Sequence, residues 1–157
     1  MTLIQITISE AEWEIMRVVW ANLAVTSREV IDILEEKMDW KESTIKTLLG
    51  RLVEKKALET NREGRKFIYT ANISEKDTMK NYSEDILSRV CNKQDGKIVR
   101  NIVEEATLSQ TDIAELIELL HEKAKTSPEE VACECMVGQC DCRIASIESK
   151  GDYKNGK

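Results

Sequence analysis

The sequence predicts a mainly α-helical protein with one small β-hairpin. Apolar residues recur at helical spacing in six segments, whereas only the segment between residues 58 and 70 carries short strand-forming runs around a glycine. The composition agrees, because the 157 residues include one proline and only 4% aromatic residues. With 41% hydrophobic and 33% charged residues, the chain is typical of a globular protein of one or two domains.

Two amphipathic helices are expected at the start of the chain. Ser9 is a suitable N-cap for the first, with Glu12 in the capping-box position. The second is expected after Thr26 or Ser27, with Glu29 in the matching position. Their predicted apolar stripes are Trp13, Met16, Trp20 and Leu23 in the first helix and Val30, Ile33, Leu34 and Met38 in the second.

A third helix is predicted from about residue 42 to residue 57. Its expected buried side chains are Ile45, Leu48, Leu49 and Leu52. The face left outside is short-chain polar and basic, and it consists of Ser43, Lys46, Thr47, Gly50, Arg51 and Glu54.

The periodicity then changes to that of a hairpin. Two short runs, 58–61 and 66–70, flank a turn that contains Gly64, and Phe67 to Tyr69 are strand formers. Three helices followed by a hairpin with a basic tip is the order of a winged helix-turn-helix, which we assign to residues 1–72.

The second half of the chain is predicted to be helical over about 74–91, 95–106 and 109–125. These short helices make a thin core on their own, so residues 73–127 are expected to complete it against a second copy, as a dimerisation domain. The alternative is that they fold back onto the first domain. The polar residues 143–157 are expected to be disordered.

The net charge is −6, but basic residues gather in one segment. Residues 1–40 carry three basic and eight acidic side chains, whereas residues 41–66 carry eight basic and four acidic ones. DNA responds to the local field of a surface rather than to the average charge. The segment is therefore compatible with DNA binding, although a solvated helix face would have the same composition.

Four of the five cysteines form two Cys-x-Cys pairs within residues 128–142: Cys133, Cys135, Cys140 and Cys142. Gly138 permits the reversal that would bring the pairs together. Because disulfides are rare in a reducing compartment, we expect a thiolate metal site. Four thiolates suit tetrahedral Zn(II), and soft sulfur also favours Cu(I). The fifth cysteine, Cys91, is expected to be a small core residue.

The charge of such a site would be the same for either metal. Four thiolates sum to −2 with one Zn²⁺ and also with two Cu⁺, so an effect of metal exchange would have to come from geometry.

Catalytic and membrane functions have no support in the sequence. No nucleophile–base pair or Gly-rich phosphate loop stands out, and the one histidine, His121, falls late in a predicted helix. No stretch approaches the ~18–20 apolar residues of a membrane span. The start MTLIQITISEAEW lacks a basic leader before a hydrophobic core. We expect a cytoplasmic protein that is not an enzyme.

Four stretches carry a family resemblance: ISEAEWEIMRVVW, TSREVIDIL, STIKTLLGRLVEKKAL and FIYTANIS. Residues 6 to 142, which contain these stretches, resemble the penicillinase-repressor (BlaI/MecI) superfamily. Together with the Cys-x-Cys-x4-Cys-x-Cys motif, they are similar to its copper-responsive members.

The resemblance implies a homodimer that binds an inverted-repeat operator in double-stranded DNA upstream of copper-export genes. Zinc on the four cysteines would keep the repressor competent, and Cu(I), delivered by a small copper chaperone, would displace the zinc and release the DNA. The resemblance also places Ser43 to Arg51 on the recognition helix and Arg62 to Lys66 on the wing.

Together with the exposed face, this predicts DNA contacts at Ser43, Thr44, Lys46, Thr47, Arg51, Arg62, Arg65 and Lys66. Arg51 is the preferred base reader, because a bidentate guanidinium contact to guanine is the commonest specific one.

Three functions are compatible with these features. The copper-responsive repressor is favoured over a repressor with a structural zinc clip that senses another signal, and over a metal-buffering protein. The β-lactam-responsive relatives are inactivated by cleavage of an Asn–Phe bond. Here Asn101 precedes Ile102, so metal exchange is the expected switch.

Overall fold

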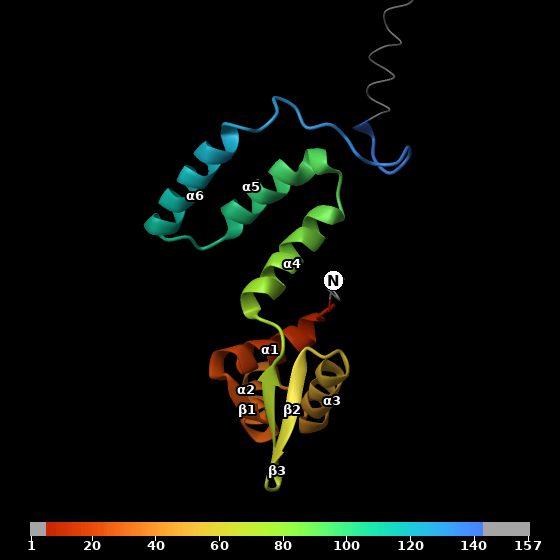
Figure 1. Cartoon of the computed structure of the whole chain (residues 1–157), viewed down its shortest axis with the longest axis vertical. Coiled ribbons are helices and arrows are strands. Elements are labelled where there is room, and N and C mark those ends of the chain that lie inside the picture. Colours follow the sequence, from red (N-terminus) through yellow and green to blue (C-terminus); the bar gives the residue numbers. More distant parts are fainter. Residues whose placement is uncertain (1–5, 143–157) are drawn as a thin grey trace, which may run out of the picture. The chain divides into compact units, whose positions relative to one another are not determined.

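The structure, a computed structural model, describes residues 6–142 (Figure 1). The predicted tail, residues 143–157, lies outside the described residues. The elements are, in chain order, α1 (Glu10–Asn22), β1 (Ala24–Thr26), α2 (Ser27–Met38), α3 (Glu42–Glu54), β2 (Leu58–Glu63), β3 (Lys66–Ala71), α4 (Glu75–Ser88), the 3-10 turn η1 (Asn92–Gln94), α5 (Asp95–Glu105) and α6 (Gln110–Ala124).

The chain forms two compact units that divide after Tyr82, inside α4 and later than the boundary predicted at residue 72. The first unit contains α1 to α3 and the sheet, and the second contains α5 and α6. The mainly helical class with a small hairpin is therefore confirmed. Among the described residues, none of the helices combines the length and apolar composition that a membrane span requires.

Capping boxes start α1 and α2 where the sequence predicts them. The Glu12 N–H donates to Ser9 Oγ over 3.2 Å, and the Ser9 N–H donates to Glu12 Oε2 over 3.0 Å. Thr26 and Glu29 repeat this exchange at α2. Each box satisfies two N–H groups near the helix start, where backbone donors have no intrahelical partner.

The apolar core of the first unit is built by α1, α2 and α3 together with the first residues of the hairpin. Burying a large apolar side chain contributes roughly 1.5–3 kcal/mol, so these contacts hold the three helices together. Two residues were wrongly predicted to belong to the buried apolar stripes, because Leu23 is 81% exposed and Ile33 is 46% exposed. The fully buried large side chains are Ile15, Met16, Val19, Val30, Ile31, Leu34, Ile45, Leu49, Leu52 and Leu58.

The sheet has the strand order β1-β3-β2 and is antiparallel. Strands β2 and β3 form the predicted hairpin, whose turn Gly64–Arg65 has φ +63° at Gly64, a conformation that glycine adopts without strain. The short strand β1 was not predicted; it places Val25 opposite Tyr69 on β3. Three helices, a hairpin and this third strand form a winged helix.

The second unit has a different character. Helices α5 and α6 contain no buried residue. Their apolar side chains are about half exposed in the single chain, and they include Val99, Ile102, Val103, Ile113, Ile117, Leu119 and Leu120. Among described residues 83–142, no apolar side chain is buried, so this unit has no core of its own.

One buried charge ties α1 to the end of α3. Glu12 is only 2% exposed, and its Oε2 accepts from Lys55 Nζ over 2.6 Å. Burial, the largest single influence, acts to raise the pKa of Glu12. The hydrogen bonds from Lys55 and Ser9 and the positive charge of Lys55 together outweigh it, and they lower the pKa below its ordinary value of 4.5.

We predict that Glu12→Gln destabilises the first unit by about 1–2 kcal/mol at pH 7, because it removes a charge-assisted hydrogen bond to a partly exposed lysine. A lowered folded-state pKa contributes stability above the unfolded-state pKa and loses it as pH falls through the folded-state value. The deficit should therefore shrink below about pH 4.5. Urea unfolding followed by tryptophan fluorescence reports on this unit, since all three tryptophans, Trp13, Trp20 and Trp40, lie in it.

The matched control is Glu10→Gln, an exposed glutamate in the same first turn, which should change stability by less than about 0.5 kcal/mol. A deficit for Glu12→Gln that is unchanged at low pH would contradict the assigned role of its charge.

Candidate functional site

Helix α3 presents one polar face because its other face is fixed in the core. Ile45, Leu49 and Leu52 are buried, so residues at the intervening positions point outward. The predicted contacts on this helix, Ser43, Thr44, Lys46, Thr47 and Arg51, are all exposed. A turn of three residues, Asp39 to Lys41, connects α2 to α3, as in a helix-turn-helix.

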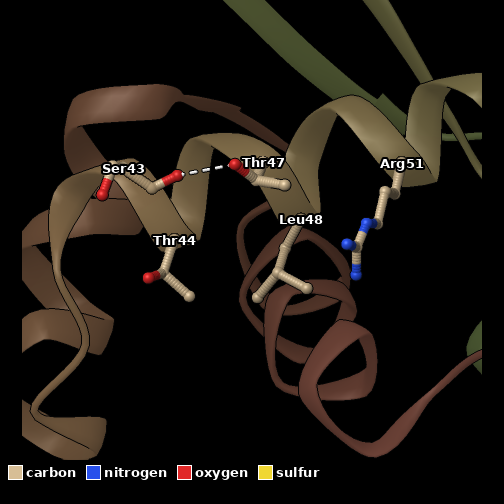
Figure 2. A pocket seen from close by; sticks show the side chains of 5 residues that line it. All are labelled: Ser43, Thr44, Thr47, Leu48 and Arg51. Atoms are coloured by element: carbon tan, nitrogen blue, oxygen red, sulfur yellow. Dashed lines mark hydrogen bonds between the residues drawn. The ribbon is translucent and has the colours of Figure 1, made fainter.

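A shallow hollow of about 250 Å³ lies on this face, lined by Ser43, Thr44, Thr47, Leu48 and Arg51 (Figure 2). The Thr47 hydroxyl donates to the Ser43 carbonyl over 2.9 Å, which fixes the Thr47 rotamer. Thr44 and the Arg51 guanidinium extend from the helix on either side of Leu48. The hollow thus combines hydroxyl groups, an apolar patch and a guanidinium.

The two basic residues of this face differ in their local partners. Lys46 forms an ion pair with Glu42 one turn earlier. Arg51 is exposed, and within the described residues its guanidinium forms no ion pair, so the group is available to a partner. Arg51 is therefore the better candidate for a bidentate contact.

The hairpin carries the other predicted basic contacts at its tip. Arg62, Arg65 and Lys66 are all exposed. Arg62 is held in place, because its Nε donates to the Gly64 carbonyl over 3.0 Å and its guanidinium carbon lies 6.0 Å from the centre of the Phe67 ring. Its remaining donors and the side chains of Arg65 and Lys66 make this tip positively charged.

The cysteine segment contains the predicted chain reversal between its two Cys-x-Cys pairs. The Gln139 N–H donates to the Met136 carbonyl over 3.1 Å, and the Met136 N–H donates to the Gln139 side chain over 3.0 Å. Gly138 has φ +91°, a conformation that favours glycine. The turn returns the chain so that Cys133 Sγ lies 3.3 Å from Cys140 Sγ.

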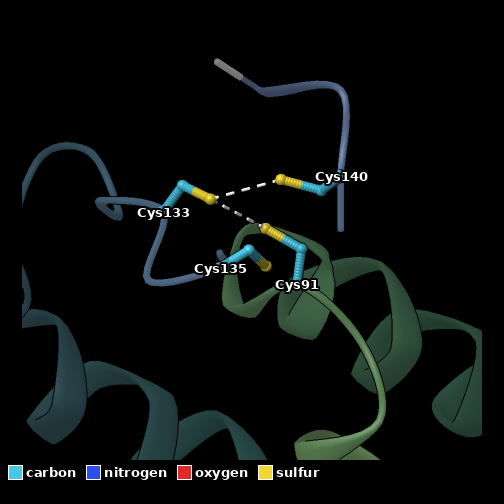
Figure 3. Close-up of side chains that lie close together, drawn as sticks. All are labelled: Cys91, Cys133, Cys135 and Cys140. Carbon is cyan, nitrogen blue, oxygen red and sulfur yellow. Dashed lines mark hydrogen bonds between the residues drawn. The ribbon is translucent and has the colours of Figure 1, made fainter. Parts of the chain in front are cut away.

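A fifth thiol joins this group. The expectation that Cys91 is a core residue was wrong: its Sγ lies 3.7 Å from Cys133 Sγ (Figure 3). It also lies 3.6 Å from Cys142 Sγ. The sulfur atoms of Cys91, Cys133, Cys135 and Cys140 all lie within 4.8 Å of one another. We call the five residues the cysteine cluster. No local pattern points to Cys91, which precedes Cys133 by 42 residues.

The thiols of the cluster do not ionise alike. A hydrogen bond with the backbone of Cys135, followed by one with the thiol of Cys140, lowers the pKa of Cys133 to about 7. Burial and hydrogen bonds with neighbouring thiols raise the pKa of Cys135 to about 12. Hydrogen bonds with Cys91 and Cys140 raise the pKa of Cys142 to about 12. Without a metal, the cluster therefore holds one thiolate readily and keeps protons on others, which metal binding has to displace.

The donor set fits a thiophilic metal ion. Zn–S bonds of about 2.3 Å place the sulfur atoms of a tetrahedron roughly 3.8 Å apart. Here Cys133 Sγ lies 3.3 Å from Cys140 Sγ and 3.7 Å from Cys91 Sγ. Neutral thiols are converted to thiolates on binding, and a shell of sulfur alone suits Zn(II) and Cu(I) but not hard cations. A cluster of four cysteines is thus in place to hold a metal ion.

Comparison with known proteins identifies the family. Residues 8–122 match the penicillinase repressor family. The penicillinase repressor of Bacillus licheniformis is 40% identical over 115 residues, which cover 73% of this chain and 90% of that protein. An uncharacterized 16.5 kDa protein of Latilactobacillus sakei is 47% identical over 135 residues, covering 86% of this chain and 92% of the relative.

A solved structure of the same kind is the solution structure of monomeric BlaI from Bacillus licheniformis in complex with the blaP half-operator. It is 45% identical and covers 45% of this chain and 87% of that chain, with a TM-score of 0.42. Because the family match spans most of the sequence and the first unit is a winged helix, the chain belongs to the penicillinase repressor family and is a transcriptional repressor with a winged-helix DNA-binding domain.

Proposed function

We propose that the chain is a copper-responsive repressor of the CopY kind. The zinc-loaded homodimer binds an inverted-repeat operator of copper-export genes in the cytoplasm, and exchange of zinc for Cu(I) at the cysteine cluster releases the DNA. The observation that carries this proposal is the cluster itself: a winged-helix repressor holds four thiols within 4.8 Å of one another.

The chemistry of the donors supports a copper signal. A shell of thiolates without nitrogen or oxygen ligands favours Cu(I) and Zn(II). Zinc keeps a tetrahedron, whereas Cu(I) accepts two or three thiolates, and the charge of four thiolates is the same with one Zn²⁺ as with two Cu⁺. Exchange would therefore act on the protein through the shape of the cluster. A small copper chaperone would supply the Cu(I).

The α3 face and the hairpin tip support the DNA-binding role. Exposed hydroxyl and guanidinium groups on α3 suit the base edges of a major groove, and the basic tip of the hairpin suits phosphates. We assign direct base contact to Arg51 and phosphate contact to Arg62, Arg65 and Lys66.

The uncovered faces of α5 and α6 support a homodimer. Side chains such as Ile113, Ile117 and Leu120 recur at helical spacing and are each about half exposed. A second copy would bury them, and a two-fold dimer matches an inverted repeat.

Arg51→Ala is predicted to weaken operator binding by about 1–3 kcal/mol and to relax the base preference at one position of each half-site. Lys66→Ala should weaken all sequences alike. Selection from a random duplex library gives the preferred operator of the wild type, and the same selection on each variant measures the preference. Arg100→Ala, which removes the same charge from α5, is the control and should bind as the wild type does. Equal, sequence-blind losses for Arg51→Ala and Lys66→Ala would refute the assigned roles.

Cys140→Ser is predicted to remain a folded dimer whose DNA binding no longer responds to copper. In the wild type, Cu(I) should lower operator affinity by about 5–150-fold, the usual range of allosteric coupling. Fluorescence anisotropy of the labelled operator measures the response to Cu(I) in the variant and in the wild type. Met136→Leu, which removes the sulfur of a residue that is 73% exposed in the same segment, should keep the wild-type response. Normal release by Cys140→Ser would remove the cysteines from the switch and leave a structural zinc clip.

Ile117→Asp is predicted to dissociate the dimer at micromolar concentration, because an unpaired charge in a buried apolar interface costs about 3–5 kcal/mol. Sedimentation velocity of the full chain measures the mass. Glu118→Ala, at the adjacent position of α6, is the control and should remain dimeric. A dimer that survives Ile117→Asp would exclude this face as the interface.

A further inference from the structure

Cys91 lies outside the Cys-x-Cys motif, yet its thiol is part of the cluster. Its Sγ lies within 4.8 Å of the sulfur atoms of Cys133, Cys135 and Cys140. It also lies 3.6 Å from Cys142 Sγ. Figure 3 shows the Cys91 side chain extending from the turn before α5 towards the thiols of the cysteine segment.

The residue after Cys91 fixes the cysteine segment in this position. Asn92 Nδ2 donates to the Ala132 carbonyl over 2.6 Å, and Asn92 Oδ1 accepts from the Glu134 N–H over 3.2 Å. These two hydrogen bonds hold the backbone in place on both sides of Cys133. The chain is therefore held so that the Cys91 and Cys133 thiols face each other at 3.7 Å.

The zinc tetrahedron has room for four of the five thiols. Cys142 does not belong to the set in which every sulfur lies within 4.8 Å of every other, whereas Cys91 does. We propose that Cys91 is a metal ligand: Cys91, Cys133, Cys135 and Cys140 hold zinc, and Cys142 is a neighbouring thiol left out of the zinc shell. This inference deepens the proposed metal site and rests on that proposal.

The assignment gives the two metals different ligand sets. Zinc is satisfied by four thiolates. Cu(I) prefers fewer ligands per ion and shares bridging thiolates, so a small Cu(I) cluster can use Cys142 beside Cys91. The assignment also indicates which segment of the chain metal binding would affect. Cys91 follows the end of α4 at Ser88 and precedes η1, so a change of ligand geometry pulls on the segment that joins α4 to α5.

Thiol alkylation of the full-length wild type tests the assignment without a substitution. The protein, metal-free or loaded with one equivalent of Zn(II), is pulsed with iodoacetamide and digested, and each cysteine is quantified by mass spectrometry. Zinc should protect Cys91 strongly and leave Cys142 reactive. Cys91 reacting as fast with zinc as without it would overturn the proposal. Equal protection of both cysteines would overturn the exclusion of Cys142 from the zinc shell.

Two variants separate a ligand from a positioning residue. Cys91→Ser should lower zinc affinity by about 100-fold or more in competition with a chromogenic chelator, since loss of an outer-shell partner alone costs ~10–100-fold. It should also reduce the thiolate-to-cobalt charge-transfer absorption of the Co(II)-substituted protein. Asn92→Ala keeps all five thiols, so it should lower zinc affinity about 10–100-fold with the charge-transfer intensity unchanged.

Cys142→Ser is the matched comparison and should cost much less zinc affinity than Cys91→Ser. The reverse order would restore the motif cysteines as the zinc shell and refute the role of Cys91. Far-UV circular dichroism checks that each variant keeps its helices. None of these measurements contains DNA, so a wild type whose operator is not released by Cu(I) would refute the proposed function and leave the ligand assignment standing.

Discussion

Closely packed thiols can all become thiolates only if a cation lies among them. In the cysteine cluster, four sulfur atoms lie within 4.8 Å of one another. A backbone hydrogen bond lowers the pKa of Cys133, burial raises the pKa of Cys135, and hydrogen bonds with neighbouring thiols raise the pKa of Cys142. Apart from its cysteines, the segment 133–142 is exposed, and the side chain of Asn92 forms hydrogen bonds with the backbone on both sides of Cys133. A metal ion bound among these thiols would therefore stabilise their ionised forms and the arrangement of the segment together.

The two units differ in how they are stabilised and in the functional surfaces they carry. The first has a complete apolar core, capped helices and a buried ion pair, so it can present α3 and the hairpin as a rigid surface for DNA. The second leaves the apolar faces of α5 and α6 uncovered and holds the cysteine cluster. In the proposed function, a second copy would cover these faces and a metal ion would bind the cluster. Helix α4 begins in one unit and ends in the other, which makes its C-terminal end the place where a signal from Cys91 would enter.

The sequence predicts what local patterns determine. Capping residues such as Ser9 and Thr26 mark helix starts, and the turn at Gly64 and the reversal at Gly138 follow from glycine's freedom at positive φ. Contacts between distant segments leave no such pattern. Strand β1 is too short to show alternation and exists because it pairs with β3. The ion pair between Glu12 and Lys55 and the approach of Cys91 to Cys133 likewise join residues more than forty positions apart. For this reason the sequence predicts the four cysteines of the motif but not the participation of Cys91.

In the proposed mechanism, one event, the replacement of zinc by Cu(I), ends DNA binding. The most direct measurement titrates the zinc-loaded, operator-bound protein with Cu(I) and records zinc release, with a chromogenic chelator, and operator anisotropy in the same sample. The two signals should change together and end at the same Cu(I) equivalents. Zinc that leaves while the operator stays bound, or an operator released with the zinc still held, would contradict the claim.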